Sequence, residues 1–187
     1  GDEILTADRH GVANLWDAKS LQLKRSILCE HHTLSAIYSA DGERIITASF
    51  SALLRIWDRT TGRELHRAAY SDMPLKHIRL SHSGEEFLTY DGDRGIRVHD
   101  AVDGNVKLTI EQDADVLGVA FSPDDQQIVT HSWDRKVCIW DRESKAIVEE
   151  YMPEAIAQKR AQYLKGGLAY SDIKQELFDV LDAKFGQ

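Results

Sequence analysis

Residues 116–141 read VLGVAFSPDDQQIVTHSWDRKVCIWD, and this stretch decides the fold of the chain. It contains three apolar segments separated by polar turns at residues 122–125 and 132–135, and the last segment closes on Trp140-Asp141. Short apolar segments bounded by turn residues are typical of antiparallel strands. The stretch therefore predicts three consecutive strands joined by hairpins.

The same pattern recurs at a fixed period along the chain. The pairs that end an apolar segment are Trp16-Asp17, Trp57-Asp58 and Trp140-Asp141, with His99-Asp100 at the corresponding place of a fourth pair. The steps between the four aspartates are 41, 42 and 41 residues, the length expected for a four-stranded unit. A similar turn precedes three of the pairs, at residues 39–42, 81–84 and 122–125. We therefore expect a repeat protein.

These repeats resemble the WD-repeat family of β-propellers. The resemblance implies an all-β fold over residues 1–151, a WD-repeat β-propeller segment of about four blades whose first blade lacks one strand. In that family a hydrogen-bond chain links the blade Trp to a Ser or Thr, a loop His and a turn Asp, and Gln112 stands near the place of the His in the fourth unit. The resemblance implies structural roles for Trp16, Trp57, Ser132, Asp134, Trp140 and Asp141.

Residues 152–187 depart from the period and form a second unit. Strong helix formers on both sides of Gly166-Gly167 predict a C-terminal helical hairpin. The segment 154–185 also resembles the C-terminal region of bacterial tryptophanyl-tRNA synthetases. The residues that carry this second resemblance are Gly166, Gly167, Tyr170, Asp172 and Lys174.

Composition argues against several classes of partner. The formal net charge is -8 and the isoelectric point is about 5.4, whereas nucleic acids and anionic membranes select basic surfaces. The sequence has no apolar run long enough to span a membrane and no signal-peptide profile at its start. We therefore expect a cytoplasmic protein that binds neither nucleic acid nor membrane.

The search for catalytic or metal-binding patterns yields little. Residues 91–95, DGDRG, begin like a calcium loop, but Val102 occupies the twelfth position where such a loop needs Glu. A polar hairpin turn is the simpler interpretation. Phosphate-binding loops, HExxH helices and nucleophile motifs do not occur. We therefore expect no enzymatic activity, no metal and no cofactor.

One position in each repeat is a candidate for binding. The residue before the turn Asp, or before its replacement, is Arg9, Phe50, Gly92 and Trp133 in the four units. The WD-repeat resemblance implies that this position points to the top face of the propeller. Because Trp, Tyr and Arg dominate interface energies, we hypothesise that Arg9, Phe50 and Trp133 bind protein. In the alternative, Phe50 and Trp133 fill space between neighbouring turns.

The leading functional interpretation is a non-enzymatic scaffold for protein–protein interaction within a longer WD-repeat protein. Two alternatives are an accessory or fusion segment related to tryptophanyl-tRNA synthetase C-terminal helices, without catalytic activity, and an enzyme with a site in the propeller channel. A blade buries its faces only against neighbouring blades, and propellers have 4–8 of them. We therefore expect continuation of the same chain upstream to complete the ring, with self-association or open edges as the other possibilities.

Overall fold

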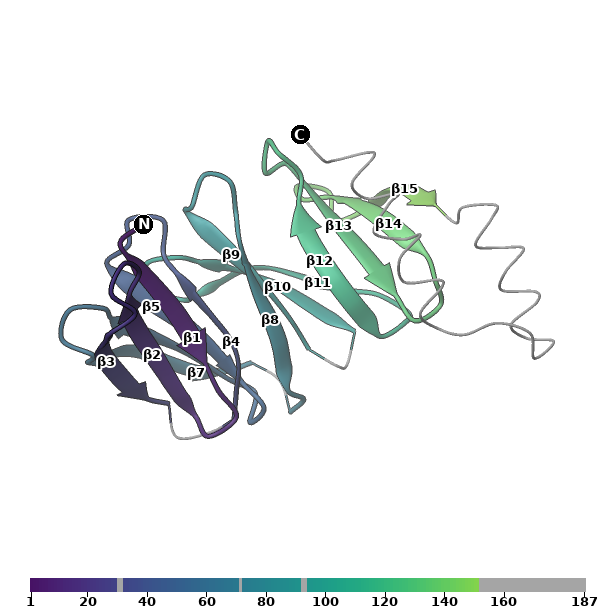
Figure 1. Ribbon diagram of the computed structural model, residues 1–187. Coiled ribbons are helices and arrows are strands. Elements are labelled where there is room, and N and C mark those ends of the chain that lie inside the picture. Colours follow the sequence, from purple (N-terminus) through teal and green to yellow (C-terminus); the bar gives the residue numbers. More distant parts are fainter. Residues whose placement is uncertain (30–31, 71, 92–93, 152–187) are drawn as a thin grey trace, which may run out of the picture.

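The computed structural model describes residues 1–29, 32–70, 72–91 and 94–151, and in these ranges it contains fifteen strands in four antiparallel sheets (Figure 1). We call the sheets blades 1 to 4 in chain order. Blade 1 comprises β1 (Glu3–Ala7), β2 (Val12–Asp17) and β3 (Leu23–Leu28). Blade 2 comprises β4 (Thr33–Tyr38), β5 (Arg44–Ser49), β6 (Leu53–Asp58) and β7 (Glu64–Ala69). Blade 3 comprises β8 (Leu75–Leu80), β9 (Glu86–Asp91), β10 (Gly95–Asp100) and β11 (Val106–Glu111). Blade 4 comprises β12 (Val116–Phe121), β13 (Gln127–Ser132), β14 (Val137–Asp141) and β15 (Ile147–Tyr151).

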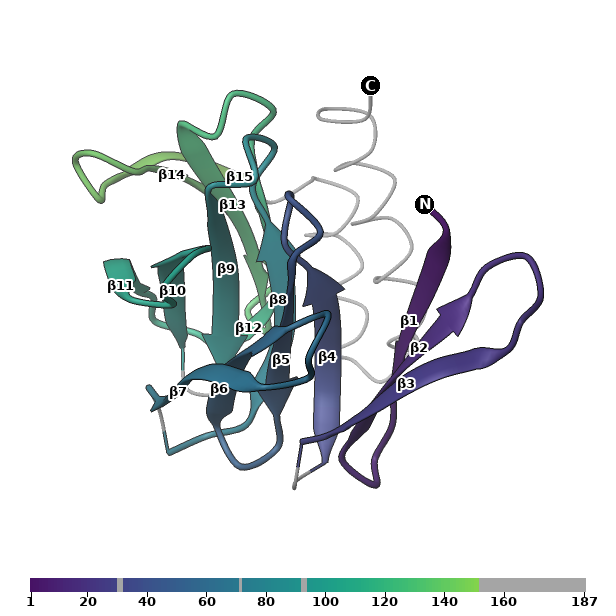
Figure 2. The same cartoon turned by 90° about the vertical axis from the view of Figure 1, so that its left-hand side faces the viewer.

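Within each blade the strands pair in sequence order, so each blade is a meander. The first strands of blades 2, 3 and 4 are β4, β8 and β12, and β8 contacts both of the others (Figures 1 and 2). These three strands therefore form the inner edge of the arrangement. Blade 1 has no strand at this position among the described residues, and its β1 contacts β4 directly. The expected blade with one missing strand is thus confirmed.

Hydrophobic clusters fill the junctions between successive blades. The junction of blades 1 and 2 buries Leu15 and Trp57, the junction of blades 2 and 3 buries Ile46 and Phe87, and a third cluster joins blades 3 and 4. Complete burial of one Leu, Ile or Phe side chain contributes about 1.5–3 kcal/mol. Each blade is therefore stabilised mainly by its neighbours. This dependence explains why the middle strands of a blade are apolar along most of their length.

An aspartate ends each of the strands β2, β6, β10 and β14 and caps the turn that follows. Asp58 Oδ1 accepts hydrogen bonds from the backbone N–H of Thr61 (2.6 Å) and from its hydroxyl (2.8 Å). Asp141 Oδ1 does the same with the N–H and hydroxyl of Ser144. These hydrogen bonds lower the pKa of Asp58 and of Asp141, and the bond from the backbone N–H has the larger effect in both cases. The fixed period therefore has a local cause, because each turn needs its own carboxylate.

The strands expected from the repeat are all present, and the consecutive antiparallel order is the expected one. The expected helical hairpin at residues 152–187 lies outside the described residues.

Candidate protein-interaction surface

The three residues proposed to bind protein lie in equivalent hairpins, those that join β1 to β2, β5 to β6 and β13 to β14. The side chain of Phe50 is 60% exposed and that of Trp133 is 56% exposed, and Arg9 is exposed as well. Large aromatic side chains with this much surface in water are available for contact with another molecule. The alternative, that Phe50 and Trp133 fill space between turns, concerns the part of each side chain that is not exposed.

Backbone contacts fix the hairpin that carries Phe50. The Phe50 N–H donates to the carbonyl of His32 (2.8 Å), and the His32 ring lies 6.2 Å from the Phe50 ring between centroids. Ala52 closes the hairpin with a positive φ of 60° and donates its N–H to the Ser49 carbonyl. The phenyl ring is therefore presented from a defined turn.

The hairpin of Trp133 has the same construction. The Trp133 N–H donates to the carbonyl of Asp115 (3.0 Å), and Arg135 closes the turn with a φ of 69°. The Ser132 hydroxyl donates to Asp134, which also accepts the N–H of Lys136. Both aromatic residues thus stand on hairpins tied to the loop that precedes the inner strand of their own blade.

Arg9 occupies a turn ordered by Asp8, whose Oδ1 accepts the N–H groups of His10 (2.9 Å) and Val12 (3.0 Å). Arg9 and Phe50 belong to adjacent blades, whereas blade 3 separates Phe50 from Trp133. Among the described residues no contact joins the three side chains. They lie at separate positions along one edge of the blades.

The tryptophan of each of three repeats forms a hydrogen bond with a threonine of the same blade. Trp16, Trp57 and Trp140 donate their indole N–H to a threonine ten residues earlier. The distances from Nε1 to Oγ1 are 2.9, 2.9 and 3.0 Å, and the acceptors are Thr6, Thr47 and Thr130. The WD-repeat resemblance implied Ser132 as a member of this hydrogen-bond chain, but the Ser132 hydroxyl donates to Asp134, and the Trp140 indole donates to Thr130. The recurring threonine was the signal in the sequence that could have identified the acceptor.

In blade 4 the chain continues as expected from the position of Gln112, because the Thr130 hydroxyl donates to Gln112 Oε1 (2.9 Å). In blade 3 His99 replaces the tryptophan and is fully buried. Its Nε2 accepts from the Thr89 hydroxyl (2.8 Å), and its Nδ1 donates to the Gly104 carbonyl (3.1 Å). Burial lowers the pKa of His99 to about 4, against the opposing effect of the Gly104 carbonyl. The imidazole is therefore neutral near pH 7.

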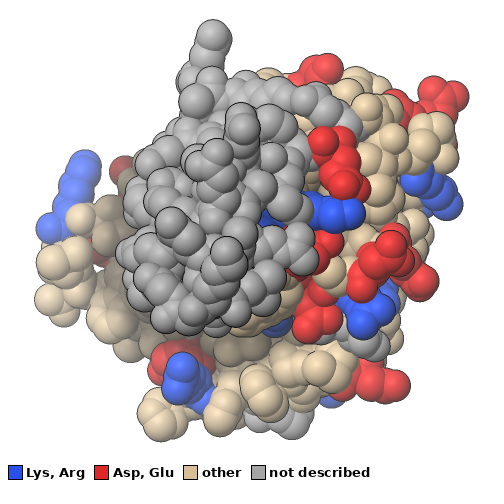
Figure 3. Space-filling model, turned by 90° about the vertical axis from the view of Figure 1, so that its right-hand side faces the viewer, with Lys and Arg blue, Asp and Glu red and all other residues tan. Residues whose placement is uncertain are grey.

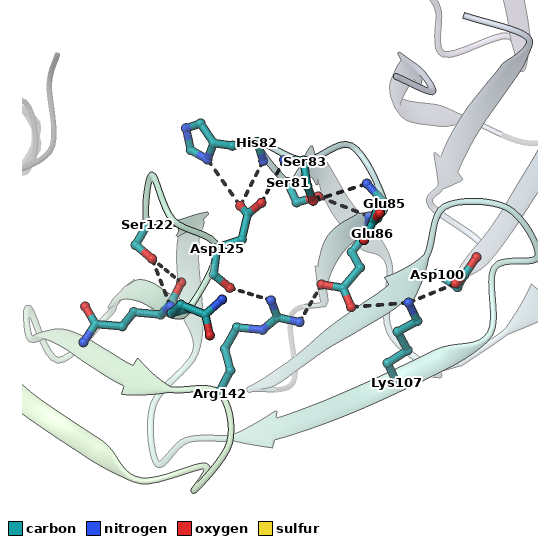
Figure 4. A network of polar contacts seen from close by, with 12 residues as sticks. Ser81, His82, Ser83, Glu85, Glu86, Asp100, Lys107, Ser122, Asp125 and Arg142 are labelled. Atoms are coloured by element: carbon teal, nitrogen blue, oxygen red, sulfur yellow. Dashed lines mark hydrogen bonds and ion pairs between the residues drawn. The ribbon is translucent and has the colours of Figure 1, made fainter. Parts of the chain in front are cut away.

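A polar network joins blades 3 and 4 (Figure 4). The Asp125 carboxylate accepts the backbone N–H groups of His82 (2.9 Å) and Ser83 (2.8 Å) across the junction. Burial opposes ionisation of Asp125, but these N–H donors outweigh it and lower its pKa. Asp125 has a φ of 58° at a turn position where Gly84 has 75°. The carboxylate that crosses the junction is therefore held on a left-handed backbone that ordinarily favours glycine.

The same junction contains a group of charges around Glu86. Arg142 of blade 4 pairs with the Glu86 carboxylate and donates to the Asp125 carbonyl. Lys107 lies 3.4 Å from Glu86 and 2.9 Å from Asp100. The side chains of Glu86 and Arg142 are only 15% and 21% exposed, so water screens their attraction less than at an open surface. The network fixes how blade 4 sits on blade 3.

An equivalent network joins blades 1 and 2, where Glu3 pairs with Lys24 (2.6 Å) and Arg59 (2.9 Å). The two networks correspond position by position, with a constant offset of 83 residues. The corresponding pairs are Glu3 and Glu86, Lys24 and Lys107, Tyr38 and Phe121, and Arg59 and Arg142. At the junction of blades 2 and 3 the corresponding residues are Arg44 and Ala101, so this pair cannot form. A cavity of about 370 Å³ lies there instead, lined by Arg44 and Ala101 among others.

The calcium-like loop has another role. Asp91 is 1% exposed, accepts the N–H of Gly95 (3.1 Å) and pairs with Arg97 Nη1 (2.6 Å). Its carboxylate is therefore engaged within the protein, as expected for a hairpin turn. Within residues 1–29, 32–70, 72–91 and 94–151, no three His, Cys, Asp or Glu side chains converge as metal ligands.

In the part of the chain that the structure describes, no helix has the length and apolar character needed to cross a membrane. Cytoplasmic location remains a prediction from the sequence.

Four antiparallel sheets with capped turns and an aromatic–threonine bond in every repeat fit a segment of a WD-repeat type β-propeller. Residues 23–58 and 103–141 match the family described as WD domain, G-beta repeat. These two matches support the WD-repeat identification.

Curated relatives extend the similarity over most of the chain. Cilia- and flagella-associated protein 52 of Chlamydomonas reinhardtii is 23% identical over 143 residues, which cover 75% of this chain and 23% of that protein. Transducin beta-like protein 3 of Bos taurus is 24% identical, covering 78% and 20%. Apoptotic protease-activating factor 1 of Rattus norvegicus is 37% identical, covering 75% and 12%. The chain thus spans less than a quarter of the length of these relatives.

Proposed function

We propose that this chain is part of a longer WD-repeat protein and acts as a non-enzymatic scaffold for protein–protein interaction. The observation that carries the proposal is the exposure of Phe50 and Trp133 on equivalent hairpins. Burial of an aromatic side chain at an interface contributes a large share of binding energy. Arg9 adds a cationic contact on the neighbouring blade. A partner that covers this edge binds through two apolar anchors and one charge.

Affinity capture with three forms of the full chain tests this proposal. The Phe50→Ala/Trp133→Ala variant is expected to lose the partners that the wild-type chain retains, by about tenfold or more. The matched control is Leu65→Ala/Val102→Ala, which removes exposed apolar groups away from these hairpins. Quantitative mass spectrometry of the retained proteins compares the three forms. Retention unaffected in the aromatic variant, with the circular dichroism spectrum preserved, contradicts the proposed surface.

Further blades are the proposed neighbours of blade 1. Trp57 and Trp140 are 5% and 6% exposed because each packs against the preceding blade, whereas Trp16 is only partly buried and Ile4 is 43% exposed. A preceding blade of the same polypeptide covers this face in our proposal, and a second copy of the chain is the alternative. Analytical ultracentrifugation distinguishes them, since self-association gives a mass that rises with concentration.

The comparisons give no support to the synthetase resemblance of residues 154–185, which lie outside the described residues.

A further inference from the structure

The inner strand of blade 3 has an unusual charge. β8 reads LKHIRL and contains Lys76, His77 and Arg79, whereas the inner strands β4 (TLSAIY) and β12 (VLGVAF) contain no charged residue. His77 and Arg79 are exposed and Lys76 is partly exposed. Three basic residues in one inner strand contrast with a chain whose formal net charge is -8. This local concentration requires an explanation.

Burial explains why the other residues of the strand are apolar. Leu75 and Ile78 are fully buried in the cluster between blades 2 and 3. The pairing of β8 with β9 shifts in register between Leu75 and His77. The shift interrupts the alternation of buried and exposed residues, so that neither Lys76 nor His77 is buried. Packing thus accounts for the leucine and isoleucine of this strand. It does not account for the cations.

Several cations on other strands have acidic neighbours. Arg44 and Arg67 pair with Asp41 and Glu64, and Lys107 pairs with Glu86 and Asp100. On the face seen in Figure 3, basic side chains likewise lie beside acidic ones. Within the described residues, in contrast, no ion pair involves Lys76 or Arg79. No carboxylate in the part of the chain that the structure describes neutralises their charges.

The three basic side chains act on one another. Partial burial, followed by the positive charges of Arg79 and Lys76, lowers the pKa of His77. The His77 ring lies 5.9 Å from the Tyr90 ring between centroids, and the Tyr90 hydroxyl donates to the Leu117 carbonyl of blade 4 (2.9 Å). β8 therefore lies close to the inner strand β12. Two cations on one strand produce a positive potential that attracts anionic groups.

We infer that the inner strand β8 binds an acidic segment of a protein partner, with Lys76 and Arg79 pairing with its carboxylates. The inference rests on the proposed scaffold function and gives the partner a chemical character. A carboxylate-rich peptide fits because the flanking strands β4 and β12 contain no acidic residue that would repel it. Nucleic acid fits less well, since the cationic stretch is short and the rest of the chain is acidic.

Fluorescence anisotropy with a labelled hexaglutamate peptide tests the inference on the full chain. Lys76→Gln/Arg79→Gln is expected to weaken binding about five- to tenfold, as the loss of two exposed ion pairs implies. The matched control Lys19→Gln/Arg63→Gln removes the same charge from turns and is expected to change binding less than about twofold. Binding by the wild-type chain must also weaken between about 30 mM and about 300 mM salt, because exposed charges are screened.

Each other outcome has a clear consequence. No binding of hexaglutamate by the wild-type chain, or equal losses in the two charge variants, overturns the inference. Tighter binding of oligoadenylate than of hexaglutamate, lost in the β8 variant, assigns the strand to nucleic acid and also overturns it. The Phe50→Ala/Trp133→Ala variant should bind hexaglutamate normally, since this peptide has no apolar anchor. A failure of the aromatic surface is thereby separable from a failure of the β8 site.

Discussion

Acid should destabilise this protein at a higher pH than its carboxylates alone would cause, because His99 is buried in its neutral form. The folded-state pKa of His99 is about 4, against 6.5 for a free histidine. Between about pH 6.5 and about pH 4, His99 therefore binds a proton in the unfolded chain but not in the folded chain. Stability is fully retained above pH 6.5, falls as the pH drops below it, and stops falling on this account below about 4. The shift of about 2.5 pKa units corresponds to about 3 kcal/mol in total.

About 2 kcal/mol of this loss should occur between about pH 7 and about pH 5. Urea unfolding followed by tryptophan fluorescence at both pH values measures it. His99→Gln removes the titrating group, so its loss of stability over the same interval should be smaller than that of the wild type by about 2 kcal/mol. The absolute stability of the variant is not the test, because the substitution also removes the ring stacked on Phe87 at 4.8 Å.

The exposed His10 supplies the control. His10→Gln makes the same change of side chain at an exposed position, so it controls for the substitution itself. His77 also has a lowered pKa, but it is present in all three proteins and cancels in the comparison. If His99→Gln loses as much stability as the wild type between pH 7 and pH 5, the reasoning from burial is refuted.

Three further predictions concern contacts within and between the blades. Arg142→Ala should lower the free energy of unfolding by about 1–2 kcal/mol, and a double-mutant cycle with Glu86→Gln should show coupling; additive effects in urea titrations would contradict the network. Trp57→Phe should lower the free energy of unfolding by about 1 kcal/mol or more, because the buried Thr47 hydroxyl loses the indole N–H that donates to it. Trp16→Phe, at a more exposed site, should lower it less. The opposite order of stabilities in thermal melts would count against this prediction. Asp91→Ala leaves a partly buried guanidinium unpaired and should cost about 3–5 kcal/mol, measured by urea unfolding, and a loss below about 1 kcal/mol would show that the pair contributes little.

The local elements of this chain could be predicted well because their causes are local. Asp58 and Asp141 cap turns within three residues of themselves, and the apolar segments between the turns have the length of strands. The period of the aspartates therefore led to the strands, their order and the missing strand of blade 1. The acceptor of the tryptophan bond was assigned wrongly, to Ser132 rather than Thr130. These two hydroxyl residues lie on the same face of β13, so only the register of β13 with β14 decides which of them the Trp140 indole reaches.

The candidate surface was predictable only in part. Sequence identified Arg9, Phe50 and Trp133 from their position in the repeat, but their exposure depends on how each hairpin packs. The sequence did not single out the basic residues of β8, since two cations and a histidine in six residues have no special meaning until the strand is placed at the inner edge. The absence of a paired carboxylate can be read only from the described residues in space.

The sequence by itself determined the repeat, the strands and their turns, since each depends on residues that are close along the chain. The tertiary structure decided which residues meet between blades, such as Glu86 with Arg142, which are 56 positions apart. It also decided that Trp57 is buried while Trp16 is partly exposed. The physical reason is that a blade has no core of its own, so burial and charge pairing arise only where one sheet packs against the next.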